Sequence, residues 1–189
     1  MTHFNTLAIH AGQEPDSATG ARALPIYQTT SFVFDSAETA AQRFALAELG
    51  PIYTRLTNPT QEAVENRIAA LEGGVGALLV SSGQSALLLA VLNVAGSGDS
   101  IVASPSLYGG SVNLLGSTLG KLGIETIWVS DPDDPDSWQS AIKPNTKALF
   151  GESIPNPKQD VLDIEAVANI AHKAGVPLIV DNTCLLYTS

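Results

Sequence analysis

Apolar and polar residues recur along the chain with a spacing that changes near residue 77. Before that point, apolar side chains return every three or four positions in two stretches, which is the spacing of amphipathic helices. The first helix should begin after Ser36, whose hydroxyl can cap it, and end at Gly50-Pro51. Its apolar face would consist of Ala40, Ala41, Phe44, Ala45 and Leu49.

A second helix is predicted between Thr60, as its cap, and Gly73-Gly74, which would terminate it. Its apolar face would consist of Val64, Ile68 and Leu71. Up to about Phe34 the sequence mixes Gly, Pro, Ser and Thr without a sustained period, so we expect an extended arm there. A loop is expected over residues 52–59.

From Ala77 onward, short β-prone runs alternate with stretches long enough for helices. The runs are Ala77–Ser81, Ile101–Ser104, Ile124–Val129, Ala148–Glu152 and Pro177–Val180. The helical stretches are Gln84–Ala95, Gly110–Leu122, Pro135–Ile142 and Ile164–Ala174, the last capped by Asp163 and ended by Gly175. Five strands alternating with four helices predict an α/β fold, with a mostly parallel sheet and helices on its faces.

Composition and charge exclude several functions. The 189 residues are 44% hydrophobic and 15% charged, which provides enough apolar surface for a sizeable core. The formal net charge of -10 makes nucleic acids and anionic membrane surfaces poor partners. The single cysteine, Cys184, cannot form an internal disulfide, and the three histidines show no metal-ligand spacing. We see no signal peptide or membrane-spanning run and expect a cytoplasmic location.

The residues after the predicted strands are the first place to look for chemistry, because ligands of open α/β sheets bind at the carboxyl ends of the strands. These residues are polar: Ser81–Gln84, Tyr108–Gly110, Glu152–Asn156 and Asp181–Thr183. Ser82-Gly83-Gln84 opens a predicted helix, so its free amide groups and the helix dipole favour an anion. An ordinary serine cap followed by a glycine turn is the alternative.

Two other enzyme classes find little support. A nucleotide site would need Gly-x-Gly-x-x-Gly or a Walker-type Gly-Lys-Ser/Thr, and neither occurs. The segment Gly83–Leu87 has the Gly-x-Ser core of a serine hydrolase but lacks the second glycine of that motif. His172 is predicted inside a helix, away from the polar rim.

Asp181 and Tyr108 narrow the class of ligand. Asp181 follows the apolar run 178–180, so its carboxylate would lie at the end of a buried strand and needs a partner. That partner is either the following turn or a cationic ring nitrogen. Tyr108 is flanked by Gly109-Gly110, where an aromatic ring can lie flat on a planar ligand, although a core role is also open. An anion site, a flat ring and a buried carboxylate together suggest pyridoxal 5'-phosphate.

Nine short motifs carry a resemblance to a known family. They are Thr6–Gln13, Pro25–Ser31, Tyr53-Thr54-Arg55, Asn58-Pro59-Thr60, Ala70–Gly74, Ser82-Gly83-Gln84, Leu107–Gly110, Glu152–Pro157 and Val180–Thr183. In these motifs and their order the chain resembles the Cys/Met-metabolism family of pyridoxal-phosphate enzymes, above all its O-acetylhomoserine sulfhydrylases. The resemblance implies part of a fold-type-I transferase (aspartate-aminotransferase-like) large domain. Residues 1–59 would form an arm, a helix and an inter-subunit loop, and residues 60–183 part of the cofactor-binding domain.

The resemblance also implies how the cofactor phosphate is held. Ser82, Gly83 and Gln84 would bind it at the helix start. Tyr53 and Arg55 would reach across a dimer interface to the phosphate of the neighbouring subunit, a task that suits a guanidinium group. A solvated loop cation is the alternative for Arg55.

For the cofactor ring, the resemblance places Tyr108 against the pyridine face, which makes it the candidate catalytic residue of this chain. Asn156 would lie near the ring hydroxyl, and Thr183 would also contact the cofactor. Asp181 would keep the ring nitrogen protonated. Glu152 would either orient Asn156 or simply end its strand.

The implied reaction is a γ-replacement that belongs to methionine biosynthesis and transsulfuration. Acetate leaves O-acetyl-L-homoserine, and sulfide or a small thiol adds to give homocysteine or methionine. The resemblance also implies a homo-oligomer of paired dimers. Cystathionine γ-synthase or a γ-lyase of the same family remains an alternative, as does a non-catalytic binding subunit.

The base expected for the proton transfers is missing. In the family it is mainly the lysine that holds the cofactor as a Schiff base, in a Ser-x-x-Lys motif downstream of Asp-Asn-Thr. Here six residues follow Thr183, and the five lysines lie elsewhere. We therefore expect an N-terminal portion of a longer enzyme, inactive and poorly soluble by itself. Residues 184–189 depart from the family and are expected to be a non-native tail, so Cys184 is given no functional weight.

Overall fold

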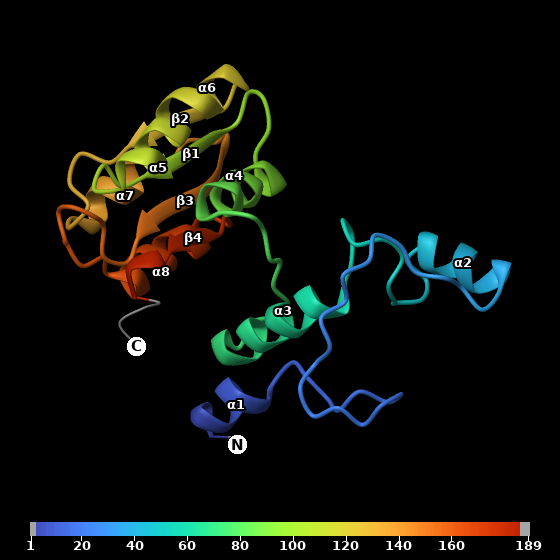
Figure 1. The fold of residues 1–189 in the computed structure, drawn as a ribbon. Helices are drawn as coiled ribbons and strands as arrows, with labels where there is room; N and C mark the ends of the chain where they lie inside the picture. Colours follow the sequence, from blue (N-terminus) through green and yellow to red (C-terminus); the bar gives the residue numbers. More distant parts are fainter. Residues whose placement is uncertain (1–2, 186–189) are drawn as a thin grey trace. The chain divides into compact units, whose positions relative to one another are not determined.

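The computed structural model describes residues 3–185 and divides into two compact units, the first up to Leu79 and the second from Val80. The first unit contains α1 (Phe4–His10), α2 (Ala37–Phe44) and α3 (Pro59–Glu72) (Figure 1). The second contains a sheet with helices on both faces. The expected division at residues 59/60 and 183/184 concerns the roles of segments and stays a prediction.

Helix α1 corrects the expectation of a fully extended arm. Seven residues are too few for a stable isolated helix, so the sequence pattern gave no signal. Packing on α3 stabilises it: Arg67 Nε donates to the Ala11 carbonyl at 2.8 Å. Gly12, with φ +76°, allows this approach, because a Cβ there would lie 2.3 Å from the Ala63 carbonyl oxygen.

Helix α2 begins as predicted but ends early. The Ser36 hydroxyl accepts a hydrogen bond from Thr39 N at 3.0 Å, which confirms the cap. The helix stops at Phe44 instead of continuing to Gly50, because Leu46 adopts a left-handed φ of +56°. Arg43 then pairs with Glu48 at 3.0 Å across the turn that follows.

Helix α3 is capped by Asn58, so the prediction of Thr60 as its cap was wrong. Asn58 Oδ1 accepts from Thr60 N at 2.9 Å, and Pro59 occupies the first helical position, where its missing N–H costs nothing. The Thr60 hydroxyl instead accepts from Tyr27 N at 3.0 Å and ties the arm to the helix. Gly73 ends the helix as predicted, with φ +65°.

The sheet of the second unit has the order β2-β1-β3-β4, and all its neighbouring strands are parallel. The strands are β1 (Ser100–Ala103), β2 (Glu125–Trp128), β3 (Thr146–Glu152) and β4 (Leu178–Asp181). The predicted strand over Ala77–Ser81 does not form. No strand within residues 3–185 pairs with it, and a strand needs a backbone partner. Leu79 N donates instead to Glu65 Oε1 at 2.7 Å.

Helices cover both faces of the sheet (Figure 1). One face carries α4 (Gly83–Val94) and the continuous helical stretch α5 (Gly109–Asn113), η1 (a π-helical turn, Leu114–Thr118) and α6 (Leu119–Lys121). The other face carries α7 (Pro135–Ala141) and α8 (Ile164–Lys173), the latter capped by Asp163 as predicted. No helix in the described part of the chain is both long and apolar enough to cross a bilayer.

Side chains of each strand alternate between two apolar cores. In β3, Phe150 packs toward α4 and η1, whereas its neighbour Leu149 packs toward α7 and α8. The largest buried side chain, Trp138 of α7, lies in the second core and donates from Nε1 to the Pro132 carbonyl at 3.0 Å. The same alternation determines toward which face of the sheet each polar side chain at a strand end points.

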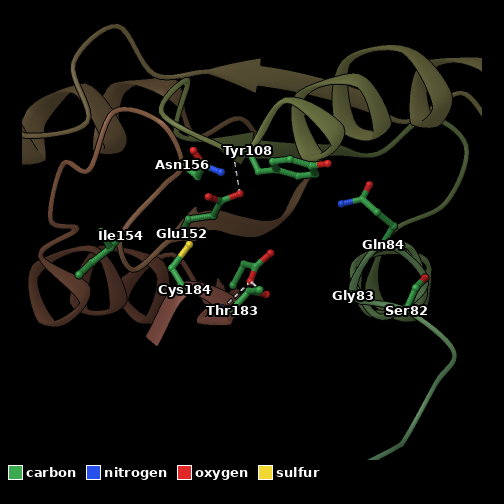
Figure 2. Close-up of a pocket in the computed structure, with 10 residues that line it drawn as sticks. Ser82, Gly83, Gln84, Tyr108, Glu152, Ile154, Asn156, Thr183 and Cys184 are labelled. Carbon is green, nitrogen blue, oxygen red and sulfur yellow. Dashed lines mark hydrogen bonds between the residues drawn. The ribbon is translucent and has the colours of Figure 1, made fainter. Parts of the chain in front are cut away.

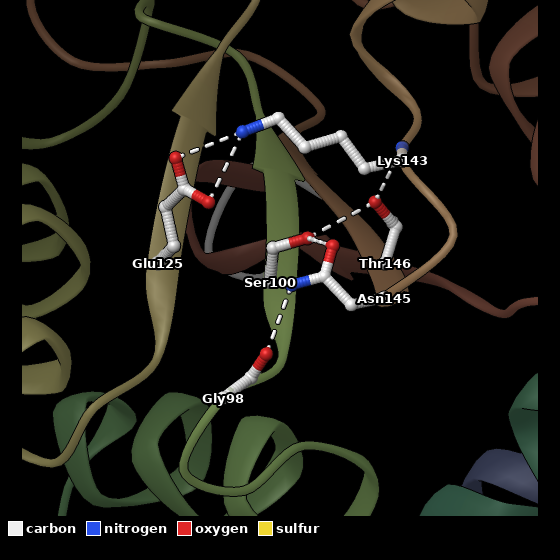
Figure 3. A network of polar contacts seen from close by, with 6 residues as sticks. All are labelled: Gly98, Ser100, Glu125, Lys143, Asn145 and Thr146. Atoms are coloured by element: carbon white, nitrogen blue, oxygen red, sulfur yellow. Dashed lines mark hydrogen bonds and ion pairs between the residues drawn. The ribbon is translucent and has the colours of Figure 1, made fainter.

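A polar network joins the strand starts at the amino end of the sheet (Figure 3). The hydroxyls of Ser100 and Thr146, both buried, lie 3.1 Å apart, and Asn145 Nδ2 donates to the Gly98 carbonyl at 2.9 Å. Lys143 pairs with Glu125 at 3.0 Å, an exposed pair that contributes little to stability. The carboxyl end of the sheet is organised differently.

Candidate cofactor-binding site

The chain leaves β1 toward β2 on one side and leaves β3 toward β4 on the other, so the connections diverge between the neighbours β1 and β3. Loops that diverge at such a point leave a crevice at the carboxyl ends of the strands. A cavity of about 320 Å³ lies there (Figure 2). Its lining residues are Ser82, Gly83, Gln84, Tyr108, Glu152, Ile154, Asn156, Asp181, Thr183 and Cys184.

Seven of the predicted cofactor-binding residues therefore meet in one cavity of the second unit: Ser82, Gly83, Gln84, Tyr108, Asn156, Asp181 and Thr183. They come from three different segments that follow strands and from the start of α4. Glu152, Ile154 and Cys184 also line it. The sequence placed Glu152 at the rim but left its role open, and it assigned no role to Ile154.

The first turn of α4 provides the anion-binding end of the cavity. Ser82 caps the helix by accepting from Ser85 N at 3.1 Å. The backbone N–H groups of Gly83 and Gln84 have no acceptor within residues 3–185, so the positive end of the helix dipole is available. A Cβ at Gly83 would meet no atom within 4 Å. Glycine there keeps open the space that a bound group would occupy.

Tyr108 precedes α5 and presents its ring to the cavity, toward Gln84 (Figure 2). The side chain is 51% exposed, so it is not core filling. The ring lies directly over Gly110, where a Cβ would be only 2.5 Å from Tyr108 Cε1. Gly110 thus permits the orientation in which one face of the ring is free.

Asp181 and Glu152 form the acidic end of the cavity. They are paired neighbours on the parallel strands β4 and β3, and both follow the alternation that turns Ile179 and Phe150 toward α4. Asp181 Oδ1 accepts from Thr183 N at 2.9 Å and from the Thr183 hydroxyl. A carboxylate pair at this position favours a ligand that carries a positive charge there.

Glu152 is the more deeply buried of the two carboxylates, with 5% of its surface exposed. Burial raises the pKa of Glu152, and the neighbouring charge of Asp181 raises it further. Hydrogen bonds from Tyr108 N, at 2.8 Å, and from the Ser111 hydroxyl and Asn156 N act in the opposite direction and lower this pKa.

None of the five lysines lines this cavity. Lys121 and Lys173 lie in the last turns of α6 and α8, and Lys143 and Lys147 lie near the amino end of β3. Lys158 follows β3 in an exposed turn. The described residues therefore supply no amine to this site.

The cavity fits pyridoxal 5'-phosphate in size and in chemistry. Its volume is at the lower end of the range for small-molecule sites, about 300–1,000 Å³. Free amide groups on one part of its wall can bind a phosphate, and two carboxylates on another part can bind a protonated ring nitrogen. Tyr108 offers a flat surface for a planar ring.

Tyr53 and Arg55 belong to the first unit. The Arg55 guanidinium carbon lies 5.4 Å from the centre of the Tyr53 ring, and both side chains are exposed. Tyr53 also forms an isolated antiparallel bridge with Ser31. Their predicted part in phosphate binding stays a prediction.

The sequence matches the family model described as Cys/Met metabolism PLP-dependent enzyme over residues 5–186. The chain belongs to this family. Membership in the Cys/Met metabolism PLP-dependent enzyme family confirms the predicted fold class and the predicted cofactor, because the family depends on pyridoxal phosphate.

Three similar proteins place the chain within the Cys/Met metabolism family. O-acetyl-L-homoserine sulfhydrylase of Corynebacterium glutamicum is 64% identical over 95% of this chain and 41% of its own length. The crystal structure of an O-acetylhomoserine (thiol)-lyase from Campylobacter jejuni, which contains N'-pyridoxyl-lysine-5'-monophosphate, matches with a TM-score of 0.93 at 42% identity, over 97% of this chain and 45% of its own.

The third is cystathionine gamma-lyase from Lactobacillus plantarum, complexed with L-serine. It matches with a TM-score of 0.86 at 32% identity and covers 96% of this chain and 45% of its own. The chain thus spans about two fifths of the length of the curated relatives it matches.

Proposed function

We propose that this chain is the cofactor-binding part of an O-acetyl-L-homoserine sulfhydrylase. The enzyme would replace the acetate of O-acetyl-L-homoserine by sulfide or a small thiol and release homocysteine or methionine. The observation that carries this proposal is the meeting of the α4 start, the Tyr108 ring and the Asp181 carboxylate in one cavity. The 64% identity to a named sulfhydrylase supports the choice of reaction.

When bound, pyridoxal phosphate withdraws electrons from the carbon atoms of an attached amino acid. The chain's own residues would hold and orient that group. The amides of Gly83 and Gln84 and the Ser82 hydroxyl bind the phosphate, and Tyr108 lies on the ring face. Asn156 and Thr183 would contact the remaining polar edge.

Asp181 would keep a proton on the ring nitrogen. Its carboxylate is half-buried at the end of β4, beside the second carboxylate, Glu152. Two neighbouring carboxylates repel each other, and a positive charge in the adjoining part of the cavity stabilises both of them. A protonated ring nitrogen supplies that charge, and the Asp181 carboxylate in turn holds the proton there.

The phosphate needs more positive charge than one helix start supplies, since the macrodipole is equivalent to about half an elementary charge. No Lys or Arg side chain from the described residues lines the cavity. We propose that Tyr53 and Arg55 of a second copy complete the site, so that the enzyme is at least a dimer. The family resemblance is the ground for proposing that such dimers pair. The stacked arrangement of Arg55 on Tyr53 holds the guanidinium group in a defined place.

The absence of a lysine from the cavity wall supports the further proposal that these 189 residues bind the cofactor without turning over substrate. The relatives do not favour cystathionine γ-synthase, a γ-lyase or a non-catalytic subunit, and the substrate test below separates these. A cytoplasmic location is part of the same proposal.

Cofactor binding is tested by titrating the purified chain with pyridoxal 5'-phosphate and following tryptophan and tyrosine fluorescence. We expect saturable binding that inorganic phosphate competes with and that Asp181→Asn weakens. Glu125→Gln, a carboxylate change at the amino end of the sheet, is the matched control and should bind normally. Absence of binding, or an equal loss in both variants, would contradict the proposal.

The reaction is tested with a chimera that joins residues 1–183 to the downstream part of the Corynebacterium glutamicum relative. We expect it to convert O-acetyl-L-homoserine and sulfide to homocysteine, in preference to O-succinylhomoserine or cystathionine. The 189-residue chain should give no turnover. Preference for cystathionine would move the assignment to the γ-lyases.

A further inference from the structure

Glu152 contacts several separate segments of the cavity wall. Its Oε1 accepts from Tyr108 N, the residue that starts α5, at 2.8 Å (Figure 2). The Ser111 hydroxyl in α5 and the Asn156 backbone N–H after β3 also face this carboxylate and lower its pKa. Asp181 is its paired neighbour on β4. These interactions favour a role for Glu152 in the cavity wall over the alternative that it simply ends β3.

The contact continues to the phosphate end of the cavity. Ser111, which is fully buried, also accepts from Gln84 Nε2 at 3.4 Å. Ser111 therefore lies between the Glu152 carboxylate, whose pKa it lowers, and Gln84 in the first turn of α4. The carboxylate therefore binds the loop that carries Tyr108 directly, and Ser111 lies between it and the first turn of α4.

The loop that carries Tyr108 is held at a second point. Ser106, 3% exposed, donates from its hydroxyl to Asp160 Oδ2 at 2.6 Å. Asp160 does not line the cofactor cavity, although it and Glu152 both line a smaller neighbouring cavity. Ser106 and Tyr108 are thus held by two different carboxylates, of which only Glu152 lies beside the ligand.

We propose that Glu152 is a positioning residue that fixes the backbone of Tyr108, and through it the aromatic ring, against the cofactor. This inference rests on the proposed cofactor function and deepens it. The carboxylate works through the Tyr108 N–H and does not itself act on the substrate. Because Asp181 is the acidic group facing Glu152, the ionisation of Glu152 responds to charge at Asp181.

The link to Tyr108 is tested without any cofactor, by following the amide proton resonance of Tyr108 by NMR as the pH is changed. We expect the resonance to move with a midpoint above 4.5, the ordinary value for Glu, because burial raises the pKa of Glu152. Glu152→Gln should abolish the movement, and Asp181→Asn should lower its midpoint. Glu125→Gln and Asp160→Asn should leave the midpoint unchanged.

A Tyr108 resonance that does not move in the wild type, or that still moves in Glu152→Gln, would overturn the proposal. If Glu152→Gln fails to fold, the Asp181→Asn comparison still decides the matter, because an unchanged midpoint there contradicts the pairing. These outcomes do not depend on the cofactor. Failure of the wild type to bind pyridoxal 5'-phosphate would instead refute the proposed function alone.

The effect on the site is tested by titration with pyridoxal 5'-phosphate. Glu152→Ala leaves the partly buried Tyr108 N–H without its acceptor and should weaken binding by about fivefold or more. Glu152→Gln keeps an acceptor oxygen and should restore the affinity to within about threefold of the wild type. Equal losses in both variants, or none in either, would overturn the positioning role.

Discussion

Replacing Gly110 with alanine should displace the Tyr108 ring while leaving the fold intact. A Cβ at this position would lie 2.5 Å from Tyr108 Cε1 and 3.1 Å from Cδ1, whereas ordinary contacts lie at 3.4–4 Å. The ring must therefore move by about 1 Å, and it can do so because it is half exposed. Alanine in a helix is favoured over glycine by about 0.5–1 kcal/mol, so the free energy of unfolding should not fall.

The displaced ring should weaken cofactor binding. A stacked aromatic contact contributes about 0.5–1.5 kcal/mol, which corresponds to a roughly 2- to 12-fold loss of affinity for pyridoxal 5'-phosphate. Fluorescence titration gives the affinity, and urea unfolding gives the stability. Gly109→Ala is the matched control, because a Cβ there would meet no atom within 4 Å. Equal affinities of Gly110→Ala and the wild type would refute the stacking role of Tyr108.

Three further predictions test capping, packing and charge. Ser82→Ala should lower the free energy of unfolding by about 1 kcal/mol and weaken cofactor binding. Asp163→Ala, at the start of α8, should lower it by a similar amount and leave cofactor binding unchanged. Urea unfolding measures the first quantity and cofactor titration the second. Leu119→Ala, in a fully buried position, should destabilise by about 2–5 kcal/mol and exposed Leu122→Ala by less than about 0.5 kcal/mol; similar values would contradict the core assignment. Burial raises the pKa of Glu152 in the folded chain above its ordinary value of 4.5. Between these two values the folded chain binds more protons than the unfolded chain. The free energy of unfolding therefore falls as the pH rises through this range. The stability of Glu152→Gln relative to the wild type should therefore increase from pH 4.5 to 7 in urea unfolding, and a decrease would contradict the sign.

The elements that follow from local chemistry were predictable from the sequence. The caps at Ser36, Ser82 and Asp163 are short-range hydrogen bonds whose donors lie within three residues, so the sequence identifies them. The four strands that form coincide with predicted β-prone runs, and the polar residues after them meet at one edge of the sheet. Their convergence follows from the parallel order alone.

The features that escaped prediction depend on distant partners. Helix α1 packs on α3, a partner that no local pattern identifies, and the run Ala77–Ser81 stays irregular because no described strand pairs with it. The contact between Tyr108 N and Glu152 joins residues 44 positions apart, so no local pattern announces it. The sequence placed Glu152 at the rim, but its partners required the fold.

The register of β3 and β4 has a consequence for how this site tolerates change. Glu152 faces the cavity because Phe150 and Ala148 occupy the same face of β3, and Asp181 does so because of Ile179. Inserting or deleting one residue within either strand would send its carboxylate to the opposite face together with every apolar neighbour. A change of length should therefore be tolerated in the connecting loops and not within these strands. The position of the acidic pair depends on the same alternation that builds the two cores.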